Sequence, residues 1–224
     1  ELQMDTLSNS VIWIGTSVIL VSLLISLLIP KNKIAYMRGF FFCPLIALLL
    51  SINAIYSLYF PLYFKDMLFT IQNCLFILDL LFWYHFFLKV LNNKKDSEKL
   101  EKLLLLTLLF AVYLIFFSTA GTKNLHVIAL TAICKTIFCV FFYYKLFKNL
   151  YYHNILKEPS FWIVTGLIFC SCLSLPFYGL NSYIKSQFSY LISSNIFSVS
   201  NMLIIIMHLF FIKAYLCTIQ VHKA

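Results

Sequence analysis

Long apolar stretches separated by short polar breaks constrain the fold of this chain more than any other feature. Seven stretches are close to the roughly 20 residues that a helix needs to cross the hydrocarbon core of a bilayer. They are too long for strands and lack an alternating pattern, so we predict that all of them are helices. The predicted spans are residues 9–30, 37–59, 67–90, 101–118, 124–147, 160–179 and 187–213.

The composition fits a chain that lies in lipid. Of the 224 residues, 62% are hydrophobic and only 11% are charged, whereas about a quarter of a soluble domain is charged. A globule of this size could not bury so many apolar side chains. The short connections leave no room for a soluble domain. We therefore predict an all-α membrane protein in which residues 1–224 form a single seven-transmembrane-helix bundle.

The basic residues predict how the bundle is oriented. Thirteen of the 17 lysines and arginines lie in the breaks that follow the first, third, fifth and seventh spans. The opposite breaks hold Lys65, Lys123 and Lys185. Because positively charged loops remain in the cytoplasm, we expect the N-terminus outside and the C-terminus inside. The net charge of +9 thus reports topology, and with Arg38 as the only arginine we expect no nucleic-acid surface.

The N-terminus and the cysteines give no sign of secretion. The opening residues ELQMDTLSNS lack a basic region, so we expect no cleavable signal peptide. Met4 is a candidate start, with Glu1 to Gln3 as a remnant of something upstream. Six of the seven cysteines lie inside apolar stretches, where we interpret them as small buried residues and not as a disulfide framework.

Two charged residues lie deep within predicted spans. Lys135 follows the outer end of its span by about eleven residues, which is roughly 16 Å of helix and close to the membrane midplane. Asp79 lies at a similar depth in residues 67–90. An isolated charge at this depth is costly, whereas an ion pair is tolerated. We predict that Lys135 faces the bundle interior and pairs with Asp79; separate water or hydroxyl partners, or a purely structural pair, are the alternatives.

Further polar side chains lie in the outer half of the predicted bundle. If they converge, they form an outward-facing pocket for a small polar ligand, with the charged pair as its floor. Ordinary hydrogen bonds between helices are the alternative, each worth about 0.6 kcal/mol. The candidate pocket residues are Asn53, Gln72, Asn73, His126, Thr131, Asn195, Ser198 and Asn201.

Small residues and aromatic residues make structural predictions. Gly166, Cys170 and Ser174 recur every four residues and favour close helix packing. Pro159 suits the first turn of a helix. Tryptophans favour the membrane interface, where we expect Trp83 and Trp162.

No catalytic motif is present, so we do not expect an enzyme or a resident cofactor. The sequence has no HExxH, P-loop or GxSxG with triad partners. His85 and His208 are one weak alternative, since at equal depth they could hold a haem between two imidazoles. Otherwise no metal site is expected.

The span pattern and the segment EPSFWIVTGLIF, which opens the sixth span, resemble a bacterial family. It comprises uncharacterised seven-transmembrane-helix proteins that are often encoded beside two-component histidine kinases. The resemblance implies a sensor-like role, signalling through a membrane or cytoplasmic protein partner, and a location in the bacterial inner membrane. The alternatives are an accessory subunit of a larger membrane complex, and a proton-coupled transporter that uses Asp79 and Lys135.

Overall fold

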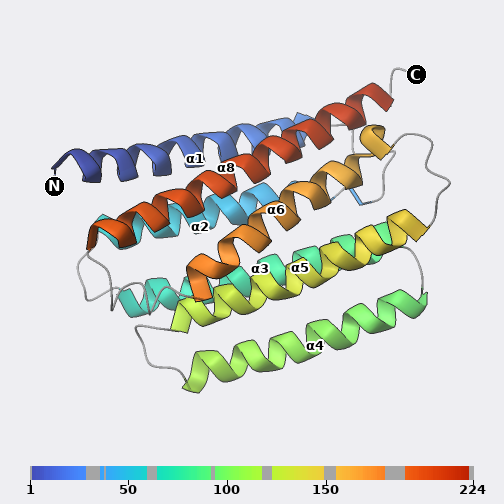
Figure 1. The fold of residues 1–224 in the computed structure, drawn as a ribbon, viewed down its shortest axis with the longest axis horizontal. Helices are drawn as coiled ribbons and strands as arrows, with labels where there is room; N and C mark the ends of the chain where they lie inside the picture. The colour runs from blue at the N-terminus through green and yellow to red at the C-terminus, as the bar shows by residue number, and fades with distance from the viewer. Residues whose placement is uncertain are drawn as a thin grey trace.

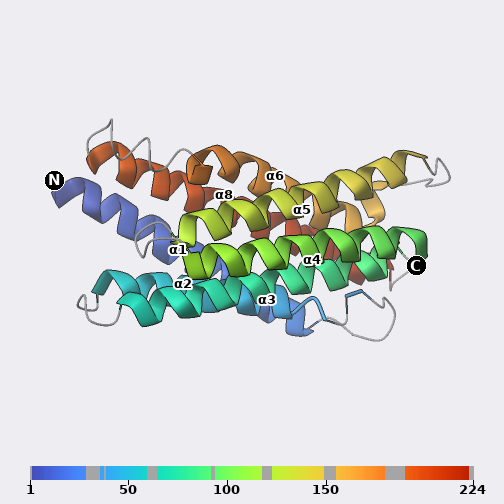
Figure 2. The same cartoon turned by 90° about the horizontal axis from the view of Figure 1, so that it is seen from below.

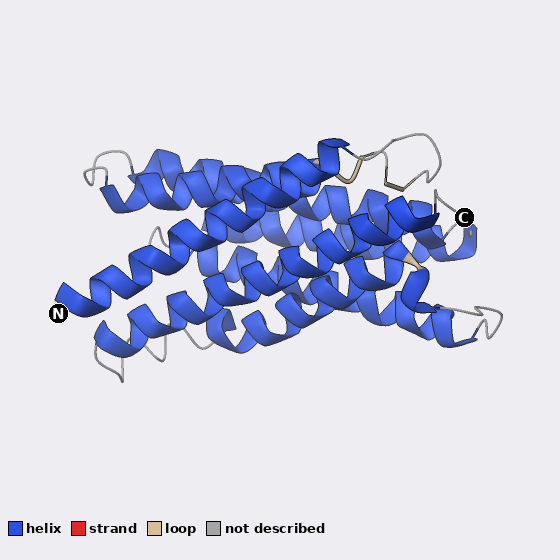
Figure 3. Ribbon diagram, turned by 90° about the horizontal axis from the view of Figure 1, so that it is seen from above, coloured by secondary structure: helices blue, strands red, loops and turns tan. Residues whose placement is uncertain are grey.

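The computed structural model describes residues 2–28, 36–37, 39–59, 65–91, 94–117, 123–148, 155–179 and 190–221. Within these ranges the chain is helical and contains no strand (Figure 3). The elements are α1 (Leu2–Leu28), α2 (Phe42–Tyr59), α3 (Lys65–Leu91), α4 (Lys94–Phe117), α5 (Lys123–Lys148), the short 3₁₀ helix η2 (Ile155–Lys157), α6 (Pro159–Gly179) and α8 (Tyr190–Val221).

The long helices lie side by side along one axis, and the two ends of the chain lie at opposite ends of the bundle (Figures 1 and 2). Helix α6 packs against both α5 and α8, and α8 packs against α1. Helix α4 lies at the edge, where it contacts α3 and α5. Helices α1, α3, α5 and α8 all run in the same direction.

Five of the described helices are long and apolar enough to cross a membrane. Their apolar segments are Ser10–Leu28, Thr70–Leu91, His126–Lys148, Pro159–Tyr178 and Ser198–Ile219, and α2 adds a shorter one, Phe42–Tyr56. Many large apolar side chains are exposed, including Leu106 at 64% and Trp13 at 56%. These features indicate a membrane-embedded bundle that contacts lipid, in agreement with the predicted class. The orientation of the termini stays a prediction.

Each of the seven predicted segments falls on one of the seven described α-helices, with shifts at their ends, whereas the count of seven membrane spans stays a prediction. Helix α4 begins at Lys94, seven residues before the predicted start. Its first turns contain Lys and Glu residues, which are good helix formers, so the helix extends beyond its apolar part. Helix α8 continues to Val221, past the predicted end at residue 213, because the added residues remain mostly apolar.

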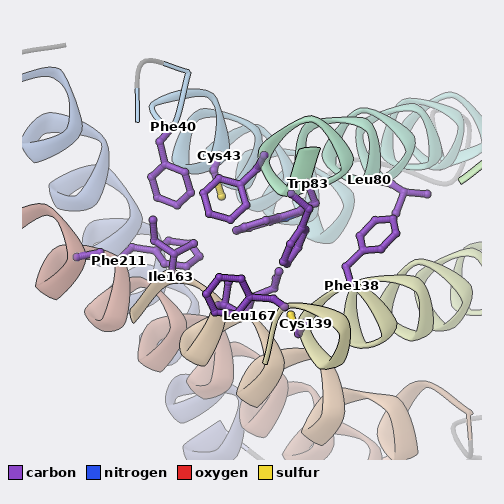
Figure 4. Packing of buried hydrophobic residues seen from close by; sticks show 14 of the residues in the cluster. Phe40, Cys43, Leu80, Trp83, Phe138, Cys139, Ile163, Leu167 and Phe211 are labelled. Atoms are coloured by element: carbon purple, nitrogen blue, oxygen red, sulfur yellow. The ribbon is translucent and has the colours of Figure 1, made fainter. Parts of the chain in front are cut away.

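An aromatic core joins the middle of the bundle to the end where α1 and α3 finish. Trp83 and Phe211 are buried with ring centroids 5.9 Å apart, and Phe40 lies 5.3 Å from Phe211 and 6.1 Å from Trp83. These rings come from α3, α8 and the turn before α2 (Figure 4). The contacts of Phe40 are edge-on and the contact between Trp83 and Phe211 is tilted, and such aromatic contacts add to the energy of burial. The core therefore couples α3 to α8, two helices far apart in the sequence.

The start of α6 is anchored as its sequence predicts. Pro159 is the first residue of the helix. The Glu158 carboxylate, just before it, accepts hydrogen bonds from the Tyr36 hydroxyl at 3.0 Å and the Ser160 hydroxyl at 3.3 Å. The Trp162 indole donates to the carbonyl of Leu156 at 2.8 Å, and Lys213 lies over the indole ring. Glu158 thus connects the α1–α2 turn to α6.

Tyr36→Phe is expected to weaken this connection in a pH-dependent way. Burial and the negative charge of Glu158 raise the pKa of Tyr36 above its ordinary value near 10. The neutral hydroxyl therefore stabilises the fold fully below about pH 10, and its contribution falls as the pH rises further. We expect Tyr36→Phe to cost about 1.5–3 kcal/mol at pH 8, because a bond to a charged acceptor is lost.

Free energies of unfolding in mixed micelles at pH 8 and pH 11 check this prediction. The difference between the wild type and Tyr36→Phe should shrink at the higher pH. Tyr144→Phe is the control, because Tyr144 is 61% exposed and should show no such cost. An equal difference at both pH values would contradict the role assigned to the neutral hydroxyl.

Candidate functional site

Asp79 and Lys135 form an ion pair in the centre of the bundle. Asp79 is the fifteenth residue of the 27-residue α3, and Lys135 is the thirteenth of the 26-residue α5. Each residue therefore lies about 20 Å from either end of its own helix. The two helices run in the same direction, so the two residues lie at a similar level in the bundle. The Lys135 Nζ donates a hydrogen bond to Asp79 Oδ2. The inward orientation and the pairing predicted from depth are therefore present in the structure.

Trp83 completes the bonding of the Asp79 carboxylate. Its indole Nε1 donates to Asp79 Oδ1 at 3.0 Å, and the four-residue spacing places both side chains on one face of α3. Trp83 is only 1% exposed and packs in the aromatic core. The prediction that Trp83 lies at the membrane interface is therefore wrong. Each carboxylate oxygen has a specific donor, so the position of the acid is well defined.

The ion pair is enclosed but not completely sealed. The Lys135 and Asp79 side chains are 15% and 13% exposed. Cys43 of α2 and Cys170 of α6 lie near Lys135. The Thr107 hydroxyl of α4 donates to Cys134 Sγ at 3.4 Å, one residue before Lys135. Side chains from three other helices, α2, α4 and α6, thus lie around the contact between α3 and α5.

All seven cysteines are free. The predicted absence of a disulfide framework is confirmed, but of the six cysteines predicted to be buried, Cys74 and Cys172 are exposed on the surface of the bundle and Cys170 is half-buried. Cys134 and Cys139 are buried on α5, and Cys43 is buried on α2. The described residues contain no group of three or more histidine, cysteine or acidic side chains that could hold a metal ion.

The predicted pocket residues on α2 and α3 connect these two helices. Asn53 is 7% exposed and donates from Nδ2 to the carbonyl of Leu68 at 3.1 Å. Asn73 is 4% exposed, and its Oδ1 has no protein partner. Gln72 is half-buried one residue earlier. Asn53 therefore makes the interhelical hydrogen bond that was the alternative to a pocket.

The remaining predicted pocket residues are spread over α5 and α8. Thr131 is buried and donates to the carbonyl of Ile128 in its own helix at 2.9 Å, whereas His126 is exposed. Ser198 is 7% exposed. Asn201 lines a small cavity with α1 and α2 residues, away from the ion pair. The side chain of Asn195 lies outside the described residues, so the described members of the set do not surround one cavity.

His85 and His208 do not fit a haem site. His85 is exposed on the surface of α3, whereas His208 is 0% exposed on α8. Two axial ligands must face one common gap, and these side chains differ too much in environment to do so. The His208 ring instead contacts Phe211, with ring centroids 5.2 Å apart.

Comparison of the chain with protein-family models, with curated proteins and with solved structures gives no match. A functional assignment must therefore come from the chemistry of the side chains. The buried ion pair is the most unusual chemical feature of the described bundle. Trp83, which donates a hydrogen bond to Asp79, could have been found from the sequence, because residues four apart lie on the same face of a helix.

Proposed function

We propose that this chain is a receptor-like sensor of a bacterial inner membrane that signals through a partner protein. The observation that carries the proposal is the Asp79–Lys135 ion pair, which joins α3 to α5 at the middle of the bundle. A buried polar contact between helices is a natural place for a ligand to act, because it can be exchanged for contacts with the ligand.

The ligand class that fits best is a small zwitterion. Its carboxylate would accept from Lys135 Nζ, and its ammonium would donate to Asp79, so that neither buried charge loses a partner. The approach would come from the predicted outer ends of α3 and α5, where Asn73 and Thr131 are buried polar residues. Exchange of the direct ion pair for a bridged one would separate α3 from α5.

The aromatic core supplies a route from the ion pair to a partner. Trp83 contacts Asp79 by a hydrogen bond and Phe211 by ring packing. A movement of α3 would therefore bias the position of α8. Lys89, Lys145 and Lys213 lie near the predicted cytoplasmic ends of α3, α5 and α8, where a partner would detect the change.

Ligand-dependent stability of the purified protein tests this proposal. Glycine and γ-aminobutyrate are suitable zwitterions, with acetate and methylammonium as singly charged controls. A zwitterion at about ten times its Kd should add about 1.4 kcal/mol to the free energy of unfolding. The double variant Asp79→Asn with Lys135→Met should lose this gain. Stabilisation that persists in the double variant, or that no zwitterion produces, would refute the proposed site.

An accessory subunit of a larger membrane complex is the second candidate, favoured by the position of α4. This helix lies at the edge of the bundle, and Leu105, Leu106, Leu109 and Phe110 are all more than half exposed on it. A photo-crosslinking residue at Leu109 in native membranes separates the two functions. Stoichiometric capture of one protein, whatever the state of the ion pair, favours the accessory subunit; lipid capture alone favours the sensor.

A further inference from the structure

Helix α8 carries a stripe of buried and half-buried polar side chains that the proposed function does not use. Asn201, His208 and Tyr215 follow one another at intervals of seven residues, which is about two helical turns, so they lie on one face. His208 and Tyr215 are 0% and 1% exposed. Asn201 Nδ2 and both His208 nitrogens are buried and have no protein partner among the described residues, whereas the Tyr215 hydroxyl lies close to the hydroxyls of Ser22 and Ser26.

Helix α1 presents a matching polar group to this stripe. A Cβ atom on Gly15 would lie 3.7 Å from Ile205 Cγ1, which fixes the register between the two helices. Because α1 and α8 run in the same direction, Ser22 falls between the levels of His208 and Tyr215. Ser22 is 0% exposed, and its hydroxyl lies close to that of Tyr215 at this end of the seam.

A cavity lies where the stripe reaches Asn201. Its volume is about 30 Å³, enough for a water molecule. The hydroxyls of Thr16 and Ser51 line it and donate to the carbonyls of Ile12 and Ala47 at 2.9 and 3.0 Å. Their oxygen lone pairs remain available as acceptors, and Asn201 Nδ2 supplies a donor. A water molecule complements this set, because it can accept from the amide and donate to both hydroxyls.

We propose that the seam between α1 and α8 is a hydrated path that binds a file of water molecules from Asn201 to Tyr215. The two residues are about 21 Å apart along the helix, most of the thickness of the hydrocarbon core. Polar groups left dry at this depth would each cost several kcal/mol. Water in the seam satisfies them and brings His208 into proton exchange with the aqueous phase.

The proton step at His208 is balanced without any co-reactant. A hydronium ion on one side gives a proton to the free imidazole nitrogen and becomes water, and the proton on the other nitrogen leaves to a water molecule on the opposite side, which becomes hydronium. A ring flip then restores the starting tautomer. Asn201, Ser22 and Tyr215 hold the water molecules on either side of the ring.

Water-edited solid-state NMR of the ¹⁵N-labelled protein in lipid bilayers tests this inference. The His208 imidazole signal is identified by its loss in His208→Gln. We expect water magnetisation to reach it severalfold faster than it reaches the backbone amides of Ile163 and Val164, which are 0% exposed in the core. Transfer to His208 as slow as to these amides would show a dry seam and overturn the proposal.

Asn201→Leu tests whether the file is continuous. The larger apolar side chain fills the cavity, so transfer to His208 should slow severalfold while the amide signals of α6 stay in place. Unchanged transfer would mean that water does not pass Asn201, which contradicts a continuous path. Neither variant alters Asp79 or Lys135, so the result is independent of the proposed ligand site.

Discussion

Replacing Lys135 by Met alone is expected to lower the free energy of unfolding by about 3–5 kcal/mol. The substitution keeps the length of the side chain but leaves the Asp79 carboxylate in the membrane interior with the Trp83 indole as its remaining donor among the described residues. The hydrogen bond from the neutral indole does not compensate the carboxylate charge as the Lys135 ammonium does. Reversible unfolding in mixed micelles of increasing SDS content measures the change.

The double variant Asp79→Asn with Lys135→Met provides the matched control. The asparagine oxygen can still accept from Trp83, and no charge remains in the interior. Because a neutral pair of similar volume often replaces a buried ion pair at little cost, we expect the double variant to lose about 1 kcal/mol or less. The two single substitutions should therefore be strongly non-additive. Additive losses would mean that the two charges do not depend on each other.

The ion pair could be predicted because few physical quantities decide it. Helix rise sets the depth of each residue, and lipid makes an unpaired charge costly. Asp79 and Lys135 are the two charged residues predicted at that depth, and their helices run in the same direction. They must therefore pair with each other or be hydrated. The helices were predictable from length and apolarity, and five of the described ones are long and apolar enough to cross a membrane; the count of seven spans stays a prediction.

The composition of the site beyond that pair depends on helix rotation, which the sequence does not specify. All the helices are apolar on most faces, so periodicity does not reveal which side of α3 or α5 points inward. Trp83 looked like an interface residue because tryptophan favours the interface, but its face of α3 is the one that carries Asp79. His126 and Thr131 share α5, yet the first is exposed and the second is buried.

The stripe of polar residues on α8 could be seen in the sequence, but its role could not be predicted from the sequence. Asn201, His208 and Tyr215 occur at intervals of seven residues, yet each has an ordinary explanation as an isolated polar residue. Only the structure shows that the Asn201 amide nitrogen and both His208 nitrogens are buried without described protein partners and that Ser22 lies beside Tyr215 in the same seam. The distinction depends on packing between α1 and α8, which are the first and last helices of the chain.

Gly166→Ala is expected to destabilise the bundle by about 1–3 kcal/mol, although alanine is the better helix former. A Cβ atom at this position would lie 2.8 Å from Phe210 Cβ and 3.1 Å from the carbonyl oxygen of Met207. Both are at or next to the backbone of α8, so no side-chain rotation relieves the contact. Helices α6 and α8 must move apart, which weakens one of the most extensive interfaces of the bundle. Free energies of unfolding in mixed micelles measure the loss.

Gly15→Ala in α1 separates this steric effect from the general effect of replacing a glycine. There the added Cβ would meet Ile205 at 3.7 Å, an ordinary van der Waals distance. The gain in helix propensity of about 0.5–1 kcal/mol should then prevail, so Gly15→Ala should be neutral or stabilising. Phe210→Ala should not rescue Gly166→Ala, because alanine retains the Cβ that causes the contact. Rescue by Phe210→Ala would place the conflict at the aromatic ring and not at the helix backbone.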